Sequence, residues 1–165
     1  MEIERKFLTQ KLPDDLSAFQ CLFIEQAYLC TNPVIRIRRQ NDEYYLTYKG
    51  GGLMVREEYN LPLTKESYEH LLAKADGNII SKKRYLIPIA NPTFKENYRI
   101  PAKPFSLKIE LDVFEPPFAP LVLAEVEFPD EEMANAFIPP AWLYKDVTDN
   151  EKYHNSNMSR QIFKL

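Results

Sequence analysis

The first seven residues carry the pattern that most constrains the fold of this chain. Read as a strand, they place Glu2, Glu4 and Lys6 on one face and the apolar Ile3 and Phe7 on the other. Taken alone, two carboxylates and an ammonium on one strand face are typical of a solvent-exposed surface. At least six later stretches repeat this division into a charged and an apolar face, which makes the first strand part of a larger arrangement.

The repeats predict about eight strands joined mostly in sequence. The expected strands cover residues 1–7, 22–29, 34–40, 44–49, 55–61, 79–87, 105–114 and 121–128. Short turns such as Asn32-Pro33 and Asn41-Asp42 link neighbours, so the sheet should be antiparallel. The run 50–52 holds three of the four glycines. It predicts a hairpin connection rather than a phosphate-binding loop, because no helix start or GK[ST] sequence follows it.

Helices are expected to be few and short. The spacing predicts one over 14–19, one that starts at Thr64 and ends near Gly77, and one after Pro129 that stops at 139–140. Residues 89–104 are proline-rich and predict an irregular excursion. Residues 146–165 are polar, then weakly helical, and should dock back on the domain. The 165 residues are 45% hydrophobic and 27% charged, which fits one domain over 1–165 with its own core.

The charged faces are segregated by sign along the chain. The cations lie mostly in the middle strands and are Lys6, Arg36, Arg38, Lys49, Arg56, Lys82 and Arg84. The acids dominate the first and the last two strands and are Glu2, Glu4, Glu58, Glu110, Asp112, Glu125 and Glu127. A surface that serves solubility usually intersperses the two signs. The segregation therefore favours a sheet that closes with this face inward and with its apolar outer face covered by helices.

A closed charged interior indicates a particular kind of ligand. Cations that face one another inside it cost several kcal/mol unless a polyanion lies between them. Phosphate chains fit, because Arg offers bidentate donors and Lys a point charge. The carboxylates suit Mg²⁺ or Mn²⁺, which would link them to the phosphates; they are Glu2, Glu4, Asp112, Glu125 and Glu127. The residues alone predict a metal-dependent polyphosphate site.

Composition excludes several other function classes. A net charge of −3 and a pI near 5.5 argue against a broad nucleic-acid surface. Cys21 and Cys30 lie near an apolar stretch, which predicts buried free thiols rather than a disulfide. Two thiols alone make no zinc site. The charged N-terminus has no apolar signal-peptide core, and no stretch approaches the roughly 20 apolar residues of a membrane span. The protein is expected to be cytoplasmic and to bind neither nucleic acid nor membrane.

The ordered motifs resemble those of the CYTH superfamily, the triphosphate tunnel metalloenzymes, in its short bacterial branch. ExExK at Glu2, Glu4 and Lys6 is a weak signal alone, but it is followed across almost the whole chain by matching segments. These are 26–29, 36–38, Lys49, 56–59, 82–85, 110–114, 125–128, 137–140 and Trp142. The resemblance implies an α+β fold, an eight-stranded antiparallel closed β-tunnel, and a linear triphosphate substrate. Many members are homodimers, although no face of this chain stands out as an interface.

The resemblance also implies roles for individual residues. The matching phosphate-binding positions are Lys6, Arg36, Arg38, Lys49, Arg56, Lys82 and Arg84. The matching metal positions are Glu2, Glu4, Asp112, Glu125 and Glu127, with Glu58 and Glu110 as additional acids. One metal would position the triphosphate, and a second metal or a general base would activate water. Lys82 is the predicted base, because neighbouring cations should lower its pKa.

Several assignments stay open at this stage. Tyr28 is a predicted catalytic residue that orients water or phosphate, with a packed aromatic as the other interpretation. Tyr153 and Asn155 belong either to a plug at one tunnel end or to a surface helix. Asn60 stands where the alternation of Arg56 and Glu58 would continue with an acid, and Ser81 stands where family members often have Glu. Three functions fit: a triphosphatase acting on inorganic, nucleoside or thiamine triphosphate; an adenylate cyclase of class IV type; or a polyphosphate-binding module without turnover.

Overall fold

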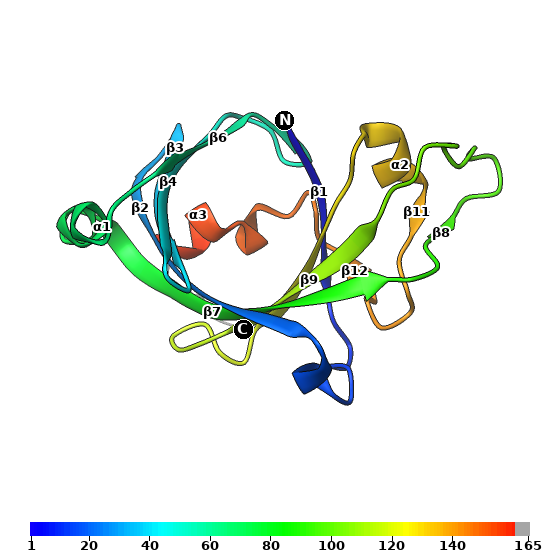
Figure 1. Cartoon of the computed structure of the whole chain (residues 1–165), viewed down its shortest axis with the longest axis horizontal. Helices are drawn as coiled ribbons and strands as arrows, with labels where there is room; N and C mark the ends of the chain where they lie inside the picture. Colours follow the sequence, from blue (N-terminus) through cyan, green and yellow to red (C-terminus); the bar gives the residue numbers. More distant parts are fainter. Residues whose placement is uncertain (161–165) are drawn as a thin grey trace.

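The computed structural model describes residues 1–160, and a single curled antiparallel sheet dominates it (Figure 1). Its strands are β1 (Glu2–Leu8), β2 (Gln20–Thr31), β3 (Val34–Gln40), β4 (Glu43–Lys49), β5 (Val55–Arg56), β6 (Glu58–Pro62), β7 (Asp76–Ile89), β9 (Leu107–Phe114), β10 (Val122–Glu127) and β12 (Lys145–Asp146). In this part of the chain the strand order is β12-β1-β10-β9-β7-β2-β3-β4-β6, with β5 paired to β1. The predicted antiparallel tunnel is confirmed as a nearly closed barrel.

The barrel closes where the single strand expected over 55–61 divides in two. In β5, Arg56 lies opposite Glu2 of β1, whereas in β6 Glu58 lies opposite Lys49 of β4. The chain therefore crosses from one edge of the sheet to the other between Arg56 and Glu58. This division and the short edge strand β12 explain why the strand count exceeds the predicted eight. In the connection from β4 to β5, Gly52 has φ +110°, and a Cβ there would collide with the Val55 carbonyl oxygen.

Helices cover the apolar outer face, as expected, although each is shorter than the sequence predicts. In α1 (Lys65–Leu72), Thr64 Oγ1 caps the helix by accepting from the Ser67 N–H at 3.1 Å. The helix ends at Leu72 rather than near Gly77, which lies inside β7 at φ +72° with its Cα against the Ser159 carbonyl. That glycine permits close approach of the C-terminal segment. The helix expected over 14–19 is a one-turn 3₁₀ helix, η1 (Leu16–Ala18).

A lobe beside the barrel packs against its outer face (Figure 1). It contains α2 (Glu131–Ala136) and a two-stranded sheet of β8 (Thr93–Phe94) and β11 (Phe137–Ile138), so the expected 89–104 excursion pairs with the segment after α2. The ring of Phe94 lies 4.9 Å from that of Tyr98 and 6.2 Å from that of Phe137, centroid to centroid. This aromatic cluster covers the apolar side of β1, β9 and β10.

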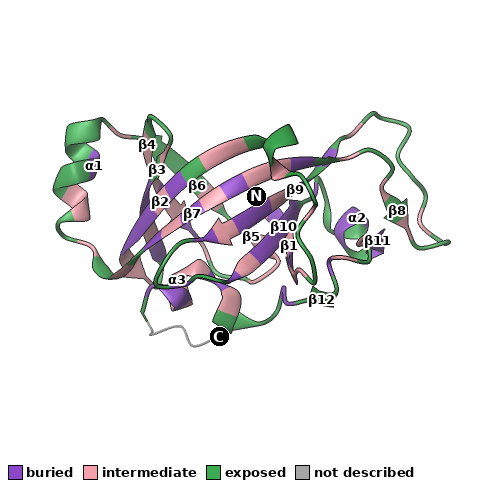
Figure 2. Ribbon diagram, turned by 90° about the horizontal axis from the view of Figure 1, so that it is seen from below, coloured by how far each residue is buried: buried purple, intermediate pink, exposed green. Residues whose placement is uncertain are grey.

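The sheet is buried on both faces over much of its length (Figure 2). Outward-facing Phe7, Leu111 and Val126 are fully buried beneath α2 and the lobe. Inward-facing charged side chains are buried as well. The C-terminal elements η2 (Glu151–Tyr153) and α3 (Asn155–Met158) lie across one end of the barrel (Figures 1 and 2). The last part of the segment expected to dock, residues 161–165, lies outside the described residues.

Two further sequence predictions concern the whole chain. Cys21 and Cys30 are free thiols, as expected, and both are half-buried. None of the helices in the described part of the chain has the length and apolar character that a membrane span requires.

Arg5 connects β1 to α2 and β12 from the outer face of the barrel. Its Nη1 donates to the carbonyl oxygens of Ala134 (2.9 Å) and Phe137 (2.8 Å), and its Nε and Nη2 donate to Asp146 Oδ2 at 3.0 and 2.6 Å. Arg5→Ala is expected to lower the free energy of unfolding by about 3 kcal/mol, because partly buried acceptors lose a charged donor. Urea denaturation checks this, with exposed Arg99→Ala as the control. Equal losses in the two variants would contradict the assignment.

Asp146 makes part of this stability depend on pH. Partial burial raises the pKa of Asp146, but hydrogen bonds from the Thr148 hydroxyl and N–H and from Arg5 outweigh it, so the pKa lies below its ordinary value. The stabilisation is therefore present above the ordinary pKa of an aspartate and is lost as pH falls through the folded-state pKa. Asp146→Asn should be less stable than the parent at pH 7, and the gap should close on acidification. Thermal melts from pH 7 to pH 2, with Asp149→Asn as the control, measure it.

Candidate functional site

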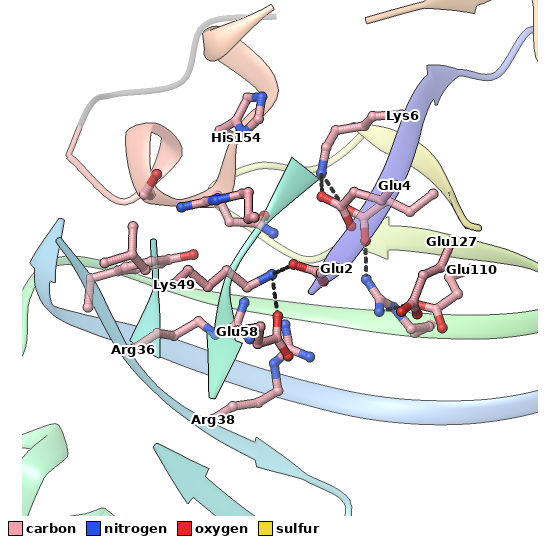
Figure 3. Close-up of a pocket in the computed structure, with 17 residues that line it drawn as sticks. Glu2, Glu4, Lys6, Arg36, Arg38, Lys49, Glu58, Glu110, Glu127 and His154 are labelled. Carbon is pink, nitrogen blue, oxygen red and sulfur yellow. Dashed lines mark hydrogen bonds and ion pairs between the residues drawn. The ribbon is translucent and has the colours of Figure 1, made fainter. Parts of the chain in front are cut away.

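The interior of the barrel is a pocket lined mainly by charged side chains (Figure 3). Alternation places every second residue of each strand inward, so strands far apart in sequence contribute side by side. The lining residues are Glu2, Glu4, Lys6, Tyr28, Val34, Arg36, Arg38, Lys49, Arg56, Glu58, Arg84, Glu110, Glu125, Glu127, His154, Asn155 and Ser156. Of the residues that the sequence predicts for phosphate and metal, all but Lys82 and Asp112 lie on this lining.

Lys82 and Asp112 lie behind the pocket wall and form an ion pair with each other, and both side chains are fully enclosed. Arg84 reaches this pair from the lining, with Nε 2.6 Å from Asp112 Oδ1 and Nη2 2.7 Å from Oδ2. Burial lowers the pKa of Lys82 to about 8; Arg84 and Arg38 add to the shift, while Asp112 opposes it. The direction of the shift agrees with the prediction for Lys82, but its ammonium does not face the pocket.

Lys6 and Lys49 line the pocket, and each lies between carboxylates. Lys6 Nζ lies 2.5 Å from Glu125 Oε1 and 3.3 Å from Glu4 Oε1, and these acids raise its pKa although burial acts the other way. Lys49 Nζ lies 2.6 Å from Glu2 and 2.8 Å from Glu58, as Figure 3 shows. Carboxylates of the protein therefore already balance the charge of each lysine in the pocket.

Arg84 is also paired with acids. Beyond its contacts with Asp112, its Nη2 lies 2.6 Å from Glu125 Oε2 and its Nη1 contacts Glu110. Burial disfavours the charged carboxylate of Glu125, yet Lys6 and Arg84 hold its pKa well below the usual range. The floor of the pocket is thus a closed network of ion pairs.

Arg36 and Arg38 differ from these cations. Within residues 1–160 neither has a carboxylate at ion-pair distance, although both are buried. Arg36 Nη2 donates to the Thr47 hydroxyl at 3.3 Å, and its Nε is buried without a hydrogen-bond partner. Burial lowers the pKa of Arg38, and the positive charge of Arg36 adds to this. Buried, uncompensated guanidinium groups side by side on β3 favour an anion between them and the pocket.

On the acidic side of the pocket, carboxylates are crowded together. Glu4 of β1 lies opposite Glu127 of β10, and Figure 3 shows Glu127 beside Glu110. Burial, followed by the charges of Glu110 and Glu4, raises the pKa of Glu127. Burial and then Glu4 raise the pKa of Glu2 to about 7, against the opposing effect of Lys49. Crowded carboxylates of this kind lower their repulsion by binding a cation.

The donor set fits a hard divalent ion in its chemistry. Oxygen ligands from carboxylates are those that Mg²⁺ and Mn²⁺ prefer. Within the described residues no three acidic, histidine or cysteine side chains are already arranged as a metal site. The ion pairs with Lys6, Lys49 and Arg84 explain this, because they draw the carboxylates toward protein cations.

The sequence reasoning missed part of the lining. His154 and Ser156 were not predicted. Asn155 was predicted to belong either to a plug at one tunnel end or to a surface helix, and it lies on the pocket lining in α3, across one end of the barrel. His154 Nε2 lies 3.1 Å from the Thr148 carbonyl oxygen; burial and then Lys6 lower its pKa. The sequence signal that could have found them is the apolar Met158 in this polar segment, which belongs to the same buried cluster as Tyr28.

Tyr28 packs in the core and also lines the pocket. It is buried in an apolar cluster with Val34 and Met158, and it also lines the pocket. Gln26 Nε2 donates to its hydroxyl at 3.4 Å. The hydroxyl therefore reaches the charged interior while the ring packs.

Comparison with known proteins gives consistent matches. Residues 1–149 match the model of the CYTH domain family. An inorganic triphosphatase of Nitrosomonas europaea is 34% identical over 164 residues, covering 98% of each chain. An inorganic triphosphatase of Acetivibrio thermocellus is 31% identical over 170 residues, covering 99% of this chain and 96% of its own. A crystal structure of an inorganic triphosphatase has a TM-score of 0.65 at 32% identity, covering 100% of this chain and 96% of that one.

Proposed function

Because this chain belongs to the CYTH domain family, we propose that it hydrolyses a linear triphosphate, with inorganic tripolyphosphate as the first candidate, inside its barrel. Two relatives that match it over nearly their whole length are named inorganic triphosphatases, which supports this choice of substrate. The reaction breaks one phosphoanhydride bond by attack of water.

The observation that carries the proposal is the separation of charge across the pocket, with, among the described residues, unpaired arginines on one wall and crowded carboxylates on the other. Arg36 and Arg38 have no acid partner within residues 1–160, whereas Glu4 and Glu127 face each other on the opposite wall. A triphosphate chain with a divalent cation bound to it satisfies both sides at once. A simple anion or a simple cation would satisfy only one of them.

The metal requirement follows from the acidic wall. Glu2, Glu4 and Glu127, with Glu125 and Glu58 adjacent, would hold Mg²⁺ or Mn²⁺ once their lysine contacts rearrange. When bound, the ion supplies charge neutralisation and polarises the phosphoryl oxygens. The chain's own task is to orient the phosphates through Arg36, Arg38 and Arg56.

The same geometry bears on two further roles within the proposal. The enclosed ammonium of Lys82 favours holding Asp112, and through it Arg84, over acting as a general base. Tyr28 lines the pocket, which supports a role for its hydroxyl in orienting a water or a phosphate oxygen. Metal identity and these roles are part of the proposal.

One substrate panel tests the proposal. The purified protein is incubated with tripolyphosphate, ATP and thiamine triphosphate, each with Mg²⁺ or Mn²⁺. We expect orthophosphate and pyrophosphate from tripolyphosphate, with slower release from the organic substrates. Cyclic AMP and pyrophosphate from ATP without orthophosphate would identify a cyclase, and binding without turnover would identify a binding module. Either result would contradict the proposed hydrolysis.

A further inference from the structure

Gln26 on β2 makes the contact that holds Arg38 in place. Its Oε1 accepts from Arg38 Nε at 3.1 Å and from Nη2 at 2.8 Å, so one amide oxygen holds the edge of the guanidinium that a carboxylate could pair with. The Gln26 side chain is fully buried, and Gln26 lies directly opposite Arg38 in the β2–β3 register. An amide therefore occupies the position from which an acid would neutralise the guanidinium.

The other contacts of the two arginines are neutral as well. Arg38 Nη1 donates to the Tyr45 hydroxyl at 3.3 Å. Arg36 Nη2 donates to Thr47 Oγ1, whose hydroxyl in turn lies 2.6 Å from Asn60 Oδ1. Lys6, Lys49 and Arg84, by contrast, each have at least two carboxylate partners. Both arginines thus keep their charge, and Arg38 is in addition held by hydrogen bonds from its Nε, Nη1 and Nη2 to neutral oxygens.

We propose that Gln26 is a positioning residue that fixes the Arg38 guanidinium while leaving its charge for the substrate. The inference rests on the proposed function, because it assumes that the anion in the pocket is the triphosphate. The free protein then carries a buried, unbalanced cation, which costs stability that the bound anion restores. A neutral side chain at position 26 is needed for tight binding of the triphosphate. An acid there stabilises the free protein and weakens that binding.

Gln26→Glu is the sharpest variant, because it changes one NH₂ group into an oxygen. The new carboxylate would keep both contacts to Arg38, and its second oxygen would accept from the Tyr28 hydroxyl, which now receives the Gln26 amide. Gln20→Glu is the matched control. It lies on the same strand, is exposed, and changes the net charge by the same amount.

Three measurements are compared between these variants and the parent. For Gln26→Glu we expect a melting temperature without ligand that is about 2–4 °C higher. We also expect a KM for tripolyphosphate that is about tenfold higher with a smaller change in kcat, and a smaller thermal shift on adding tripolyphosphate in EDTA. Gln20→Glu should match the parent in all three. A purely structural role for Gln26 would give loss of stability without a selective change in KM.

Gln26→Met keeps the size of the side chain and removes the acceptor. It should raise KM without raising the melting temperature, because Arg38 keeps its charge and loses its orientation. A Gln26→Glu protein that is destabilised or unfolded, or that has the KM of Gln20→Glu, would overturn the inference. If the parent hydrolyses tripolyphosphate and Gln26→Glu gives one of these contrary results, the positioning role of Gln26 fails while the proposed function stands. If the parent neither binds nor hydrolyses tripolyphosphate, the proposed function fails, while the melting temperatures still test the charge balance at Arg38.

Discussion

Replacing Arg38 by alanine is expected to lower kcat/KM for tripolyphosphate by about 10²-fold, because the phosphate chain loses a buried, charged donor that no acid among residues 1–160 neutralises. In this described part of the chain, the three guanidinium nitrogens of Arg38 donate only to neutral oxygens. Arg38→Lys should recover only part of the loss, since an ammonium cannot reproduce the planar fork of a guanidinium.

The neighbouring arginine on β3 provides the control for this experiment. Arg39 is exposed on the outer side of the strand, and its Nε donates to the Asn41 carbonyl oxygen at 2.9 Å. Arg39→Ala removes the same charge from the same strand and should leave kcat/KM within about twofold of the parent. Equal losses in Arg38→Ala and Arg39→Ala would show that general electrostatic attraction, not the interior site, governs binding.

Removing divalent metal is expected to reduce hydrolysis to background, and adding Mg²⁺ or Mn²⁺ back should restore it. The physical reason is the crowding of carboxylates on β1 and β10, where Glu4 lies opposite Glu127. Glu4→Gln removes one anionic ligand and should raise the metal concentration for half-maximal activity by about tenfold or more. Activity titrated against each metal at saturating tripolyphosphate measures this.

A matched acid outside the barrel separates ligation from general charge. Glu115 follows β9 and is exposed, so Glu115→Gln should leave the metal titration unchanged. Full activity in EDTA would contradict the metal requirement. An unchanged metal titration in Glu4→Gln would instead show that other acids on the lining are the metal ligands.

Local pattern was sufficient to predict which faces of the strands carry charge. Alternation is a property of the extended backbone, so the inward positions of Glu2, Lys6 and Arg36 could be read from spacing alone. The same alternation predicted that Ile3 and Phe7 lie on the covered outer face. Turn residues and the Thr64 cap likewise act over a few residues and were predicted close to where they occur.

Helix ends and the closure of the barrel were predicted less well, because distant contacts decide them. Gly77 is typical of a helix end, yet it serves the approach of the Ser159 carbonyl from the far end of the chain. The 55–61 strand divides because β1 and β4 each pair with one half of it. Neither partner is visible in the local sequence.

The sequence by itself determined that a charged interior of both signs would form, since period-two alternation is local. Only the tertiary structure decided which charges are neutralised. Register places Arg84 opposite Asp112, encloses Lys82 behind the wall, and brings His154 to the lining from the C-terminal segment. It also places Gln26, rather than an acid, opposite Arg38. Ion pairing depends on distances of a few ångströms between strands far apart in the chain, and the closed sheet alone fixes those distances.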